Sequence, residues 1–417
     1  MRVGVLVDLP LGEGAGGHVR CWERLAEAAR DFAAEIDLTV HFMGTAAARR
    51  DLSDTVRYQI EAPMFSTSRL PFLSHVPDHT DLAPFHPRLA RHLPDYDIIH
   101  TTDAYFAYAR TAMIVGRRRK IPVVNSVHTN TPEYARLFTE QTIERLFGET
   151  VISSVLLSRL GVAQLMERRM LRQLAAYQRQ CAYALVSRPE QLDSLRKTMG
   201  GRAGLLRRGI DRTAFHPGRR DRAWLAEQYG VPAERLAIMA AGRLNRGKNI
   251  LLLADAVAKL IETGVDAHLI CAGDGEDRAA VMTRLGARAT CPGTVAPEEL
   301  ARLYASADLF ALSSRIEESA NALLEALASG LPVLVARDSG MGRAVRENET
   351  GLVLPGNDSA SWAQALSDLA AQPSRRLAMS HAARADAENA VPSWQNVLAQ
   401  DLLPHWEDAA RHWHLAG

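Results

Sequence analysis

Two glutamates eight residues apart, Glu317 and Glu325, are the first residues whose spacing points to chemistry. They lie in SSRIEESANALLEALASGLPVLVA, where the pattern predicts a short helix between two strand-like apolar runs. A carboxylate accepts several hydrogen bonds, so the two side chains can each bind a hydroxyl pair of one extended polar ligand. An amphipathic helix with a solvated glutamate also fits this spacing, so other residues must decide.

A basic pair precedes the glutamates in AAGRLNRGKN. Arg243 and Lys248 follow directly on a predicted strand and come before a predicted helix. Arginine offers a planar fork of donors and lysine a point charge, and both suit a diphosphate. The context of strand, loop and helix, together with the glutamates, favours phosphate binding over a solvated loop.

A glycine-rich turn follows the first predicted strand, Arg2–Val7. Three glycines match the dinucleotide-binding pattern G-x-G-x-x-G: Gly12, Gly14 and Gly17. We disfavour an NAD site because LPL separates the strand from the first glycine. In addition, Asp37 lies at the beginning of the second predicted strand rather than at its tip. We expect Gly16 and Gly17 to bring backbone amides and a helix N-terminus close to phosphate.

These features together resemble the retaining nucleotide-sugar glycosyltransferases of family 4, which have the two-domain GT-B fold. The resemblance spans nearly the whole chain and is strongest from Arg208 to Gly351. The segments SVHTNTPEYARLF and RRGIDRTAFHPGRR look like those of sulfoquinovosyl-diacylglycerol synthases and of glycolipid mannosyltransferases. Those enzymes use lipid acceptors at the cytosolic membrane face.

The resemblance implies a role for each matching residue. Arg243 and Lys248 would hold the diphosphate, Glu317 would bind donor-sugar hydroxyls, and Glu325 would bind the ribose. His128, at the end of a predicted strand, would meet the donor sugar from the first domain. Further donor contacts are implied at Gly16, Gly17, Gly273, Gly293, Val295, Ala320, Asn321 and Ala322.

One part of the pattern departs from the family. The turn between the glutamates usually contains Phe-Gly, often followed by Asn, whereas this chain has Ser319-Ala320 before Asn321. Backbone amides of this turn normally touch the phosphates and the sugar. The departure leaves a non-catalytic GT-B nucleotide-binding protein as one alternative, although the Arg/Lys and glutamate pairs disfavour it. A nucleotide-sugar 2-epimerase is another, but no acid/base set for the sugar C2 is apparent.

The resemblance also implies the mechanism. Retaining enzymes of this type need no protein nucleophile, because the leaving phosphate is thought to deprotonate the acceptor on the face from which it departs. We therefore expect no general base, no cofactor and no metal, with the Arg/Lys pair supplying the positive charge. The co-substrate would be a UDP- or GDP-linked hexose, and the acceptor a hydroxyl of a diacylglycerol-type lipid or of a saccharide.

Bulk composition limits the other possibilities. The chain of 417 residues is 47% hydrophobic and 23% charged, which indicates a globular protein with two domains. A net charge of +1, and a basic stretch without interleaved aromatics, argue against nucleic-acid binding. The four cysteines show no paired spacing, which fits a reducing cytosol. We expect no signal peptide and no membrane-spanning segment.

Charge is distributed unevenly. Residues 110–220 contain 21 Lys and Arg against 8 Asp and Glu. This excess indicates a basic face that meets an anionic partner, with a solvated helix face as the alternative. Because the resemblance implies lipid acceptors, we expect peripheral binding to an anionic surface at the inner face of the cytoplasmic membrane. The basic residues include Arg117–Lys120, Arg168, Arg169, Arg172 and Arg179.

Strands and helices alternate along the chain in two series, which predicts the α/β class with two Rossmann-like doubly wound domains. Strands are expected at 2–7, 38–43, 97–100 and 123–128, and then within 235–244, 267–275, 307–314 and 331–336. Loops and short helices are expected at 61–94, and a helical tract at 145–181. In GT-B terms, we predict an acceptor-binding domain (1–204) that faces a donor-binding domain (205–385) across a cleft. A helical tail (386–417) would cross back to the first domain.

Overall fold

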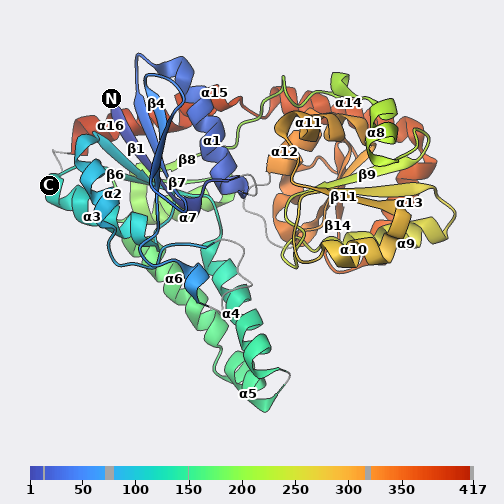
Figure 1. Cartoon of the computed structure of the whole chain (residues 1–417), viewed down its shortest axis with the longest axis horizontal. Coiled ribbons are helices and arrows are strands. Elements are labelled where there is room, and N and C mark those ends of the chain that lie inside the picture. The colour runs from blue at the N-terminus through green and yellow to red at the C-terminus, as the bar shows by residue number, and fades with distance from the viewer. Residues whose placement is uncertain (13–14, 71–78, 149, 315–320, 414–417) are drawn as a thin grey trace. The chain divides into compact units, whose positions relative to one another are not determined.

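The computed structural model describes residues 1–12, 15–70, 79–148, 150–314 and 321–413. The chain divides into two compact units, unit 1 (Met1–Arg207 with Gln395–Gly417) and unit 2 (Arg208–Trp394). Each unit has helices packed on a central, mostly parallel sheet (Figure 1). The predicted α/β architecture is thereby confirmed.

Unit 1 contains an eight-stranded sheet in the order β3-β4-β2-β1-β5-β6-β7-β8, in which only the β3–β4 pairing is antiparallel among the described strands. Its strands are β1 (Arg2–Pro10), β2 (Asp37–Met43), β3 (Ala48–Asp51), β4 (Val56–Glu61), β5 (Ile98–Thr101), β6 (Val123–Val127), β7 (Tyr183–Val186) and β8 (Ala203–Leu205). Its main helices are α1 (Gly17–Ala29), α2 (Pro87–His92), α3 (Ala107–Arg119), α4 (Thr131–Phe147), α5 (Val151–Ser154), α6 (Val162–Gln178), α7 (Pro189–Met199) and α16 (Leu403–His412). The central strands are buried on both faces because helices cover both.

The first strand is longer than predicted. β1 continues past Val7 to Pro10 through an irregularity in its pairing with β2. The argument that LPL separates the strand from the glycines is therefore wrong. The argument from the second strand remains, because Asp37 opens β2 and forms an ion pair with Arg57 at the N-terminal edge of the sheet. Strands β3 and β4 were not predicted; the side chains of β3 are exposed and those of β4 are only partly buried.

The predicted helical tract at 145–181 is half of a hairpin. α4 leaves the C-terminal end of β6, α5 and a π-helical segment (Val155–Arg159) form the turn, and α6 returns. We call residues 131–178 the arm, which projects from unit 1 in Figure 1. The second half of α6 lies on the sheet's helical layer, where the Tyr177 hydroxyl donates to the Ala109 carbonyl at 3.0 Å. Its first half extends beyond the sheet, beside α4.

Unit 2 contains a six-stranded parallel sheet in the order β11-β10-β9-β12-β13-β14. The strands are β9 (Leu236–Ala241), β10 (Ala267–Ala272), β11 (Ala289–Gly293), β12 (Leu309–Leu312), β13 (Val333–Ala336) and β14 (Gly351–Leu354). The main helices are α8 (Arg222–Tyr229), α9 (Ile250–Glu262), α10 (Arg278–Leu285), α11 (Pro297–Ser306), α12 (Asn321–Ala328), α13 (Ser359–Ala371) and α14 (Pro373–Asn389). Two apolar clusters fill the layers on either side of this sheet.

The unit boundaries lie later in the chain than the predicted ones. Leu205, expected to open the second domain, ends β8 and pairs with Val186 of β7. Residues 386–394, expected in the tail, stay with unit 2, because α14 continues to Asn389 and the Ile210 N–H donates to the Pro392 carbonyl at 3.0 Å. After this point the chain returns to unit 1 through α15 (Trp394–Val397) and α16.

The tail is built into unit 1 by polar and apolar contacts. Trp406 of α16 is fully buried, and its indole N–H donates to Nδ1 of His100 on β5 at 2.9 Å. The carboxylate of Asp401 forms an ion pair with Arg207 at 2.7 Å. Neither contact can be made by the first 207 residues alone, so unit 1 depends on both ends of the chain.

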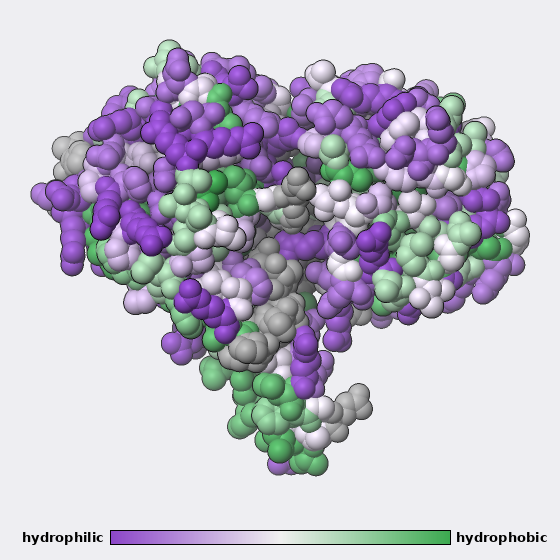
Figure 2. Space-filling view, viewed as in Figure 1, coloured by the Kyte–Doolittle hydropathy of each residue, from purple (hydrophilic) through white to green (hydrophobic). Residues whose placement is uncertain are grey.

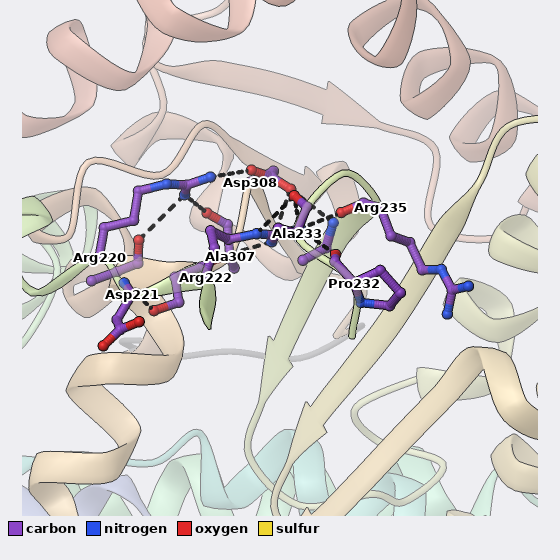
Figure 3. Close-up of polar contacts among 11 residues, drawn as sticks. Arg220, Asp221, Arg222, Pro232, Ala233, Arg235, Ala307 and Asp308 are labelled. Carbon is purple, nitrogen blue, oxygen red and sulfur yellow. Dashed lines mark hydrogen bonds and ion pairs between the residues drawn. The ribbon is translucent and has the colours of Figure 1, made fainter. Parts of the chain in front are cut away.

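An arginine–aspartate cluster fixes the segment that enters unit 2 (Figure 3). Asp308, just before β12, accepts from Arg220 at 2.7 Å and pairs with Arg222 at 3.3 Å. Its second oxygen also accepts from the backbone N–H of Ala237 on β9 at 2.8 Å. Arg222 further donates to the carbonyls of Pro232, Ala233 and Arg235. Arg220 is the last residue of RRGIDRTAFHPGRR, and Arg222 is the first residue of α8. Together they join α8, β9 and β12 at the N-terminal edge of the sheet.

Two further features concern the described residues only. None of the helices there is long and apolar enough to cross a bilayer. All four cysteines are buried and none is in a disulfide, and the sequence-distant Cys271 and Cys291 lie on neighbouring strands β10 and β11.

Candidate functional site

The candidate donor site in unit 2 lies at the C-terminal edge of the sheet. The loops after β9, β10, β11 and β12 all leave from this edge because the strands are parallel. They carry Gly242–Lys248, Gly273–Gly275, Gly293–Val295 and the approach to α12. Parallel α/β sheets bind ligands at this edge, where helix N-termini also point.

Glycine is required where two of these loops cross. The Gly242 N–H donates to the Ala272 carbonyl at 2.9 Å, and the Leu244 N–H to the Asp274 carbonyl at 2.9 Å. Gly273 has a φ of 144°, and a Cβ there would lie 1.9 Å from the Gly242 carbonyl oxygen. A side chain at Gly273 would therefore separate the two loops, so their crossing requires glycine at this position.

The basic pair lies on the loop between β9 and α9. Arg243 and Lys248 are both partly exposed. Lys248 Cε lies 3.9 Å from the position that a Cβ would take on Gly242, so the lysine side chain reaches back over the strand end. The Lys248 carbonyl accepts from the Ser313 hydroxyl at 3.1 Å, which ties this loop to the end of β12. Both cations thus stand on a loop that is anchored at two sides.

Of the two glutamates, Glu325 lies in α12 and is partly buried. Its neighbour is Tyr304 of α11, whose side chain is fully buried. Burial, followed by the negative charge of Glu325, raises the pKa of the Tyr304 phenol well above its usual value. Sequence reasoning missed Tyr304, because it precedes Glu325 by 21 residues and has no motif of its own.

Other predicted donor residues divide into three groups. Glu317 and Ala320 lie outside the described residues, as does the altered Ser319-Ala320 turn. Asn321 and Ala322 open α12 and are partly buried, so the first amides of this helix follow directly on the undescribed segment. Gly293 ends β11 with a φ of 81°, and Val295 lies partly buried two residues later, beside an apolar cluster.

The predicted residues of unit 1 also lie at a C-terminal sheet edge. Gly16 caps α1 and Gly17 is the first residue of that helix. His128 follows β6 and is 5% exposed. Its ring stacks on His18 of α1, with 4.5 Å between the ring centroids and 7° between the planes. The structure therefore brings His128 to the start of the helix that the two glycines open.

A buried chain of hydrogen bonds determines the tautomer of His128. Nε2 of His128 accepts from the indole N–H of Trp22 at 3.2 Å, so the proton of the neutral ring resides on Nδ1. The same nitrogen lies 2.7 Å from the Ser126 hydroxyl, which lies 2.8 Å from Nε2 of His100. The other nitrogen of His100 accepts from Trp406. Because both indoles can only donate, each proton in this series of hydrogen bonds has a single possible position.

Sequence reasoning found His128 but not the residues behind it. Burial, with a smaller contribution from His405, lowers the pKa of His100 to about 3, which keeps His100 neutral. Trp22, Ser126, His100 and Trp406 come from four different elements, and no spacing in the sequence connects them.

Among the described residues, no group of His, Cys, Asp and Glu has the arrangement of a metal site. Asp95 and Asp97 have the D-x-D spacing of metal-dependent glycosyltransferases, but they precede β5, at the N-terminal edge of the sheet. Asp97 accepts there from the backbone N–H of Arg2 at 2.7 Å. This pair therefore lies at the edge opposite His128.

Known proteins resemble this chain in sequence and in fold. Residues 235–372 match the family described as glycosyl transferases group 1. This range runs from the start of β9 to the end of α13 and includes Arg243, Lys248 and Glu325.

Two relatives share the description D-inositol 3-phosphate glycosyltransferase. The protein from Corynebacterium urealyticum is 34% identical over 205 residues, which are 46% of this chain and 48% of that protein. The protein from Rhodococcus jostii is 28% identical over 336 residues, which are 77% of this chain and 68% of that protein. The chain thus spans about half the length of the first relative and two thirds of the second.

Solved structures extend the likeness to the whole chain. Sucrose-phosphate synthase from Thermosynechococcus elongatus aligns over 100% of both chains with a TM-score of 0.68 and 18% identity. Anabaena HepE, solved in complex with UDP and glucose, covers 96% of this chain and 98% of its own with a TM-score of 0.66 and 17% identity. The fold is therefore GT-B. Within its second unit, residues 235–372 carry the likeness to the group 1 glycosyl transferases.

Proposed function

We propose that this protein is a retaining glycosyltransferase that moves a hexose from a UDP- or GDP-sugar to a hydroxyl of a lipid or saccharide acceptor. The observation that carries the proposal is the gathering of Arg243, Lys248 and Glu325 at one sheet edge, inside the segment that matches group 1 glycosyltransferases. HepE was solved with UDP-glucose, and the curated relatives are named for an inositol phosphate. Both names fit a nucleotide-sugar donor and a hydroxyl acceptor.

In the proposed reaction, Arg243 and Lys248 stabilise the charge that develops on the leaving diphosphate, assisted by the N-terminus of α12. The carboxylate of Glu325 accepts from the ribose hydroxyls, and Glu317 takes the donor-sugar hydroxyls. The bond from the sugar C1 to the phosphate oxygen breaks while the acceptor oxygen bonds to C1 on the same face. The leaving phosphate takes the acceptor proton, so no protein base and no metal is assigned.

On the side of unit 1, the proposal gives His128 a donating role. Its proton resides on Nδ1, so the ring offers an N–H rather than a lone pair to a sugar hydroxyl at that atom. Gly16 and Gly17 place the first amides of α1 in the same neighbourhood. The acceptor is proposed to reach this edge from an anionic bilayer surface, for which the basic excess of residues 110–220 gives support.

The first test is donor binding measured by thermal stability in EDTA, with UDP, GDP, ADP and NAD as ligands. A ligand at one hundred times its Kd stabilises by about 2.7 kcal/mol. We expect one nucleoside diphosphate to raise the Tm, and Glu325→Ala and Arg243→Ala to weaken that ligand roughly tenfold or more. The matched controls are Glu298→Ala, at an exposed position of α11, and Arg284→Ala, at an exposed position of α10. Stabilisation by NAD alone, or equal loss in the controls, contradicts the proposal.

A further inference from the structure

The arm carries an apolar surface that nothing else in unit 1 covers. Among the described residues, thirteen large apolar side chains are exposed, and eight of them lie between residues 146 and 171. Those eight are Leu146, Phe147, Val151, Ile152, Leu160, Leu165, Met166 and Leu171. Figure 2 shows apolar side chains gathered at the end of the arm. An exposed apolar patch of this kind marks an interaction site in a soluble domain.

The exposure follows from how the arm is built. Within its outer part, only Ile143, Ser153 and Ala163 are buried, although α4 and α6 pack along one another and Arg136 of α4 pairs with Glu167 of α6 at 3.4 Å. The turn itself is well formed, because Thr150 and Ser153 make a reciprocal capping box at the start of α5. Val151 is 79% exposed and Ile152 is 56% exposed on that ordered turn. The apolar tip is therefore displayed on a defined helical scaffold.

Positive charge surrounds the tip. Arg145, Arg159, Arg168, Arg169 and Arg172 are exposed, and none forms an ion pair within the described part of the chain. Of the neighbouring described acids, Glu140 and Glu167 are engaged by Arg136, at 3.2 and 3.4 Å, and Glu144 is exposed beside Arg145. This arrangement suits an anionic bilayer. The apolar side chains can enter the acyl-chain boundary while the arginines contact the anionic headgroups above it.

Two other observations separate this surface from the rest of the basic stretch. The cluster Arg117–Lys120 ends α3 and precedes β6, so it lies at the N-terminal edge of the sheet. The arm leaves from the C-terminal edge, where His128 ends β6. The basic residues of unit 1 therefore do not form one face, and the arm is the part that shares an edge with the candidate site.

We propose that the arm is a membrane-docking element, with its tip entering the bilayer interface and its arginines binding anionic headgroups. This deepens the proposed membrane association and rests on it, but it does not depend on which donor is used. A second copy of the chain is a poorer partner for this tip, because it would bring the same unpaired arginines together. α4 contains 17 residues, so the tip stands roughly 25 Å from the start of the arm.

The test is co-flotation of the full chain with phosphatidylcholine vesicles, with and without phosphatidylglycerol. We expect flotation with the anionic vesicles and release by salt. The variant Leu146→Ser/Val151→Ser/Ile152→Ser should bind these vesicles roughly tenfold or more weakly. The matched control, Met282→Ser/Leu377→Ser, removes exposed apolar side chains of unit 2 and should float as the unsubstituted chain does.

A charge variant, Arg168→Gln/Arg169→Gln/Arg172→Gln, should reduce flotation with anionic vesicles and leave binding to neutral vesicles unchanged. The Tm shift with nucleoside diphosphate, measured on each variant, reports folding and donor binding separately. A tip variant that floats normally overturns the docking role even if the donor binds. Concentration-dependent dimers that the tip substitutions abolish, without flotation, would assign the tip to a second copy and also overturn it.

Discussion

At the scale of single residues, buried histidines decide how the protein responds to acid. His100 and His41 are fully buried in unit 1, and burial lowers the pKa of each to about 3. A histidine in the unfolded chain has a pKa of about 6.5. Between these values the unfolded state binds the proton and the folded state does not. Above pH 6.5 these histidines therefore do not lower the free energy of unfolding. Their protonation in the unfolded state lowers it progressively as the pH falls from 6.5 toward 3.

We predict that His100→Gln makes unit 1 less sensitive to acid. On lowering the pH from 7.0 to 5.5, a histidine with this shift loses about 1 kcal/mol of unfolding free energy, which glutamine does not. Urea unfolding at the two pH values measures the difference. The exposed His381→Gln is the control and should leave the pH dependence unchanged. An unchanged pH dependence in His100→Gln as well would mean that His100 binds protons equally in the folded and unfolded states, which contradicts the lowered pKa.

The same residues explain the candidate site. His128 is held by Trp22 and Ser126, and Glu325 by its position beside Tyr304. In both cases the residue with the proposed role stands in a recognisable motif. The residues beside it, Trp22 and Tyr304, belong to no motif and come from other elements.

At the scale of elements, partly buried charges join α8 to strands β9 and β12 within unit 2. Asp308 has an 18% exposed side chain and Arg222 a 13% exposed one, and both lie within the cluster of Figure 3. Replacing the Asp308 carboxylate by an amide removes its charge and one of its two acceptor oxygens, so the two arginines and the Ala237 N–H are left with a single acceptor. This loss is larger than that of a solvated surface pair.

We predict that Asp308→Asn destabilises unit 2 by about 2–4 kcal/mol. The control is Asp255→Asn, which loses a pair with Arg284 whose side chains are 46% and 37% exposed and should cost about 0–1 kcal/mol. Urea unfolding of both variants, followed by a probe in unit 2, measures the difference. Equal stabilities would mean that the cluster of Figure 3 contributes no more than a surface ion pair.

At the scale of the whole molecule, unit 1 is completed only when the chain comes back to it. Val397, Leu398, Leu402 and Trp406 are fully buried there although they follow all of unit 2 in sequence. A buried Trp side chain removes about 150–250 Å² of surface from water. The tail is therefore a part of the unit 1 core, joined to it after unit 2 has been made.

We predict that a chain ending at Trp394 loses most of the stability of unit 1, because truncating several buried side chains approaches the 5–15 kcal/mol of a typical domain. Hydrogen exchange read by mass spectrometry should show fast exchange in β5, β6 and β7, with unit 2 peptides still protected. A chain ending at Trp413 is the control. Protection of unit 1 in both chains would show that α16 is dispensable.

The sequence by itself determined the elements that depend on local patterns. Apolar runs followed by a turn or a helix predicted β9, β10, β12 and β13, and the Glu-x7-Glu segment predicted a helix that exists as α12. The loop that holds Arg243 and Lys248 follows from the same pattern, because parallel strands end at one edge. Strand β4 and the hairpin form of the arm were not predicted, since partly buried and amphipathic segments do not reveal what they pack against.

Only the tertiary structure decided which distant residues meet. The hydrogen bond from Trp406 to His100 joins residues 306 apart in the chain, and Asp308 meets Ala237 across 71 residues. The end of unit 1 at Arg207 and the late return of the tail were likewise decided by packing. Local patterns record the conformation of a segment, whereas its partners are set by which buried polar and apolar groups satisfy one another once the sheets have formed.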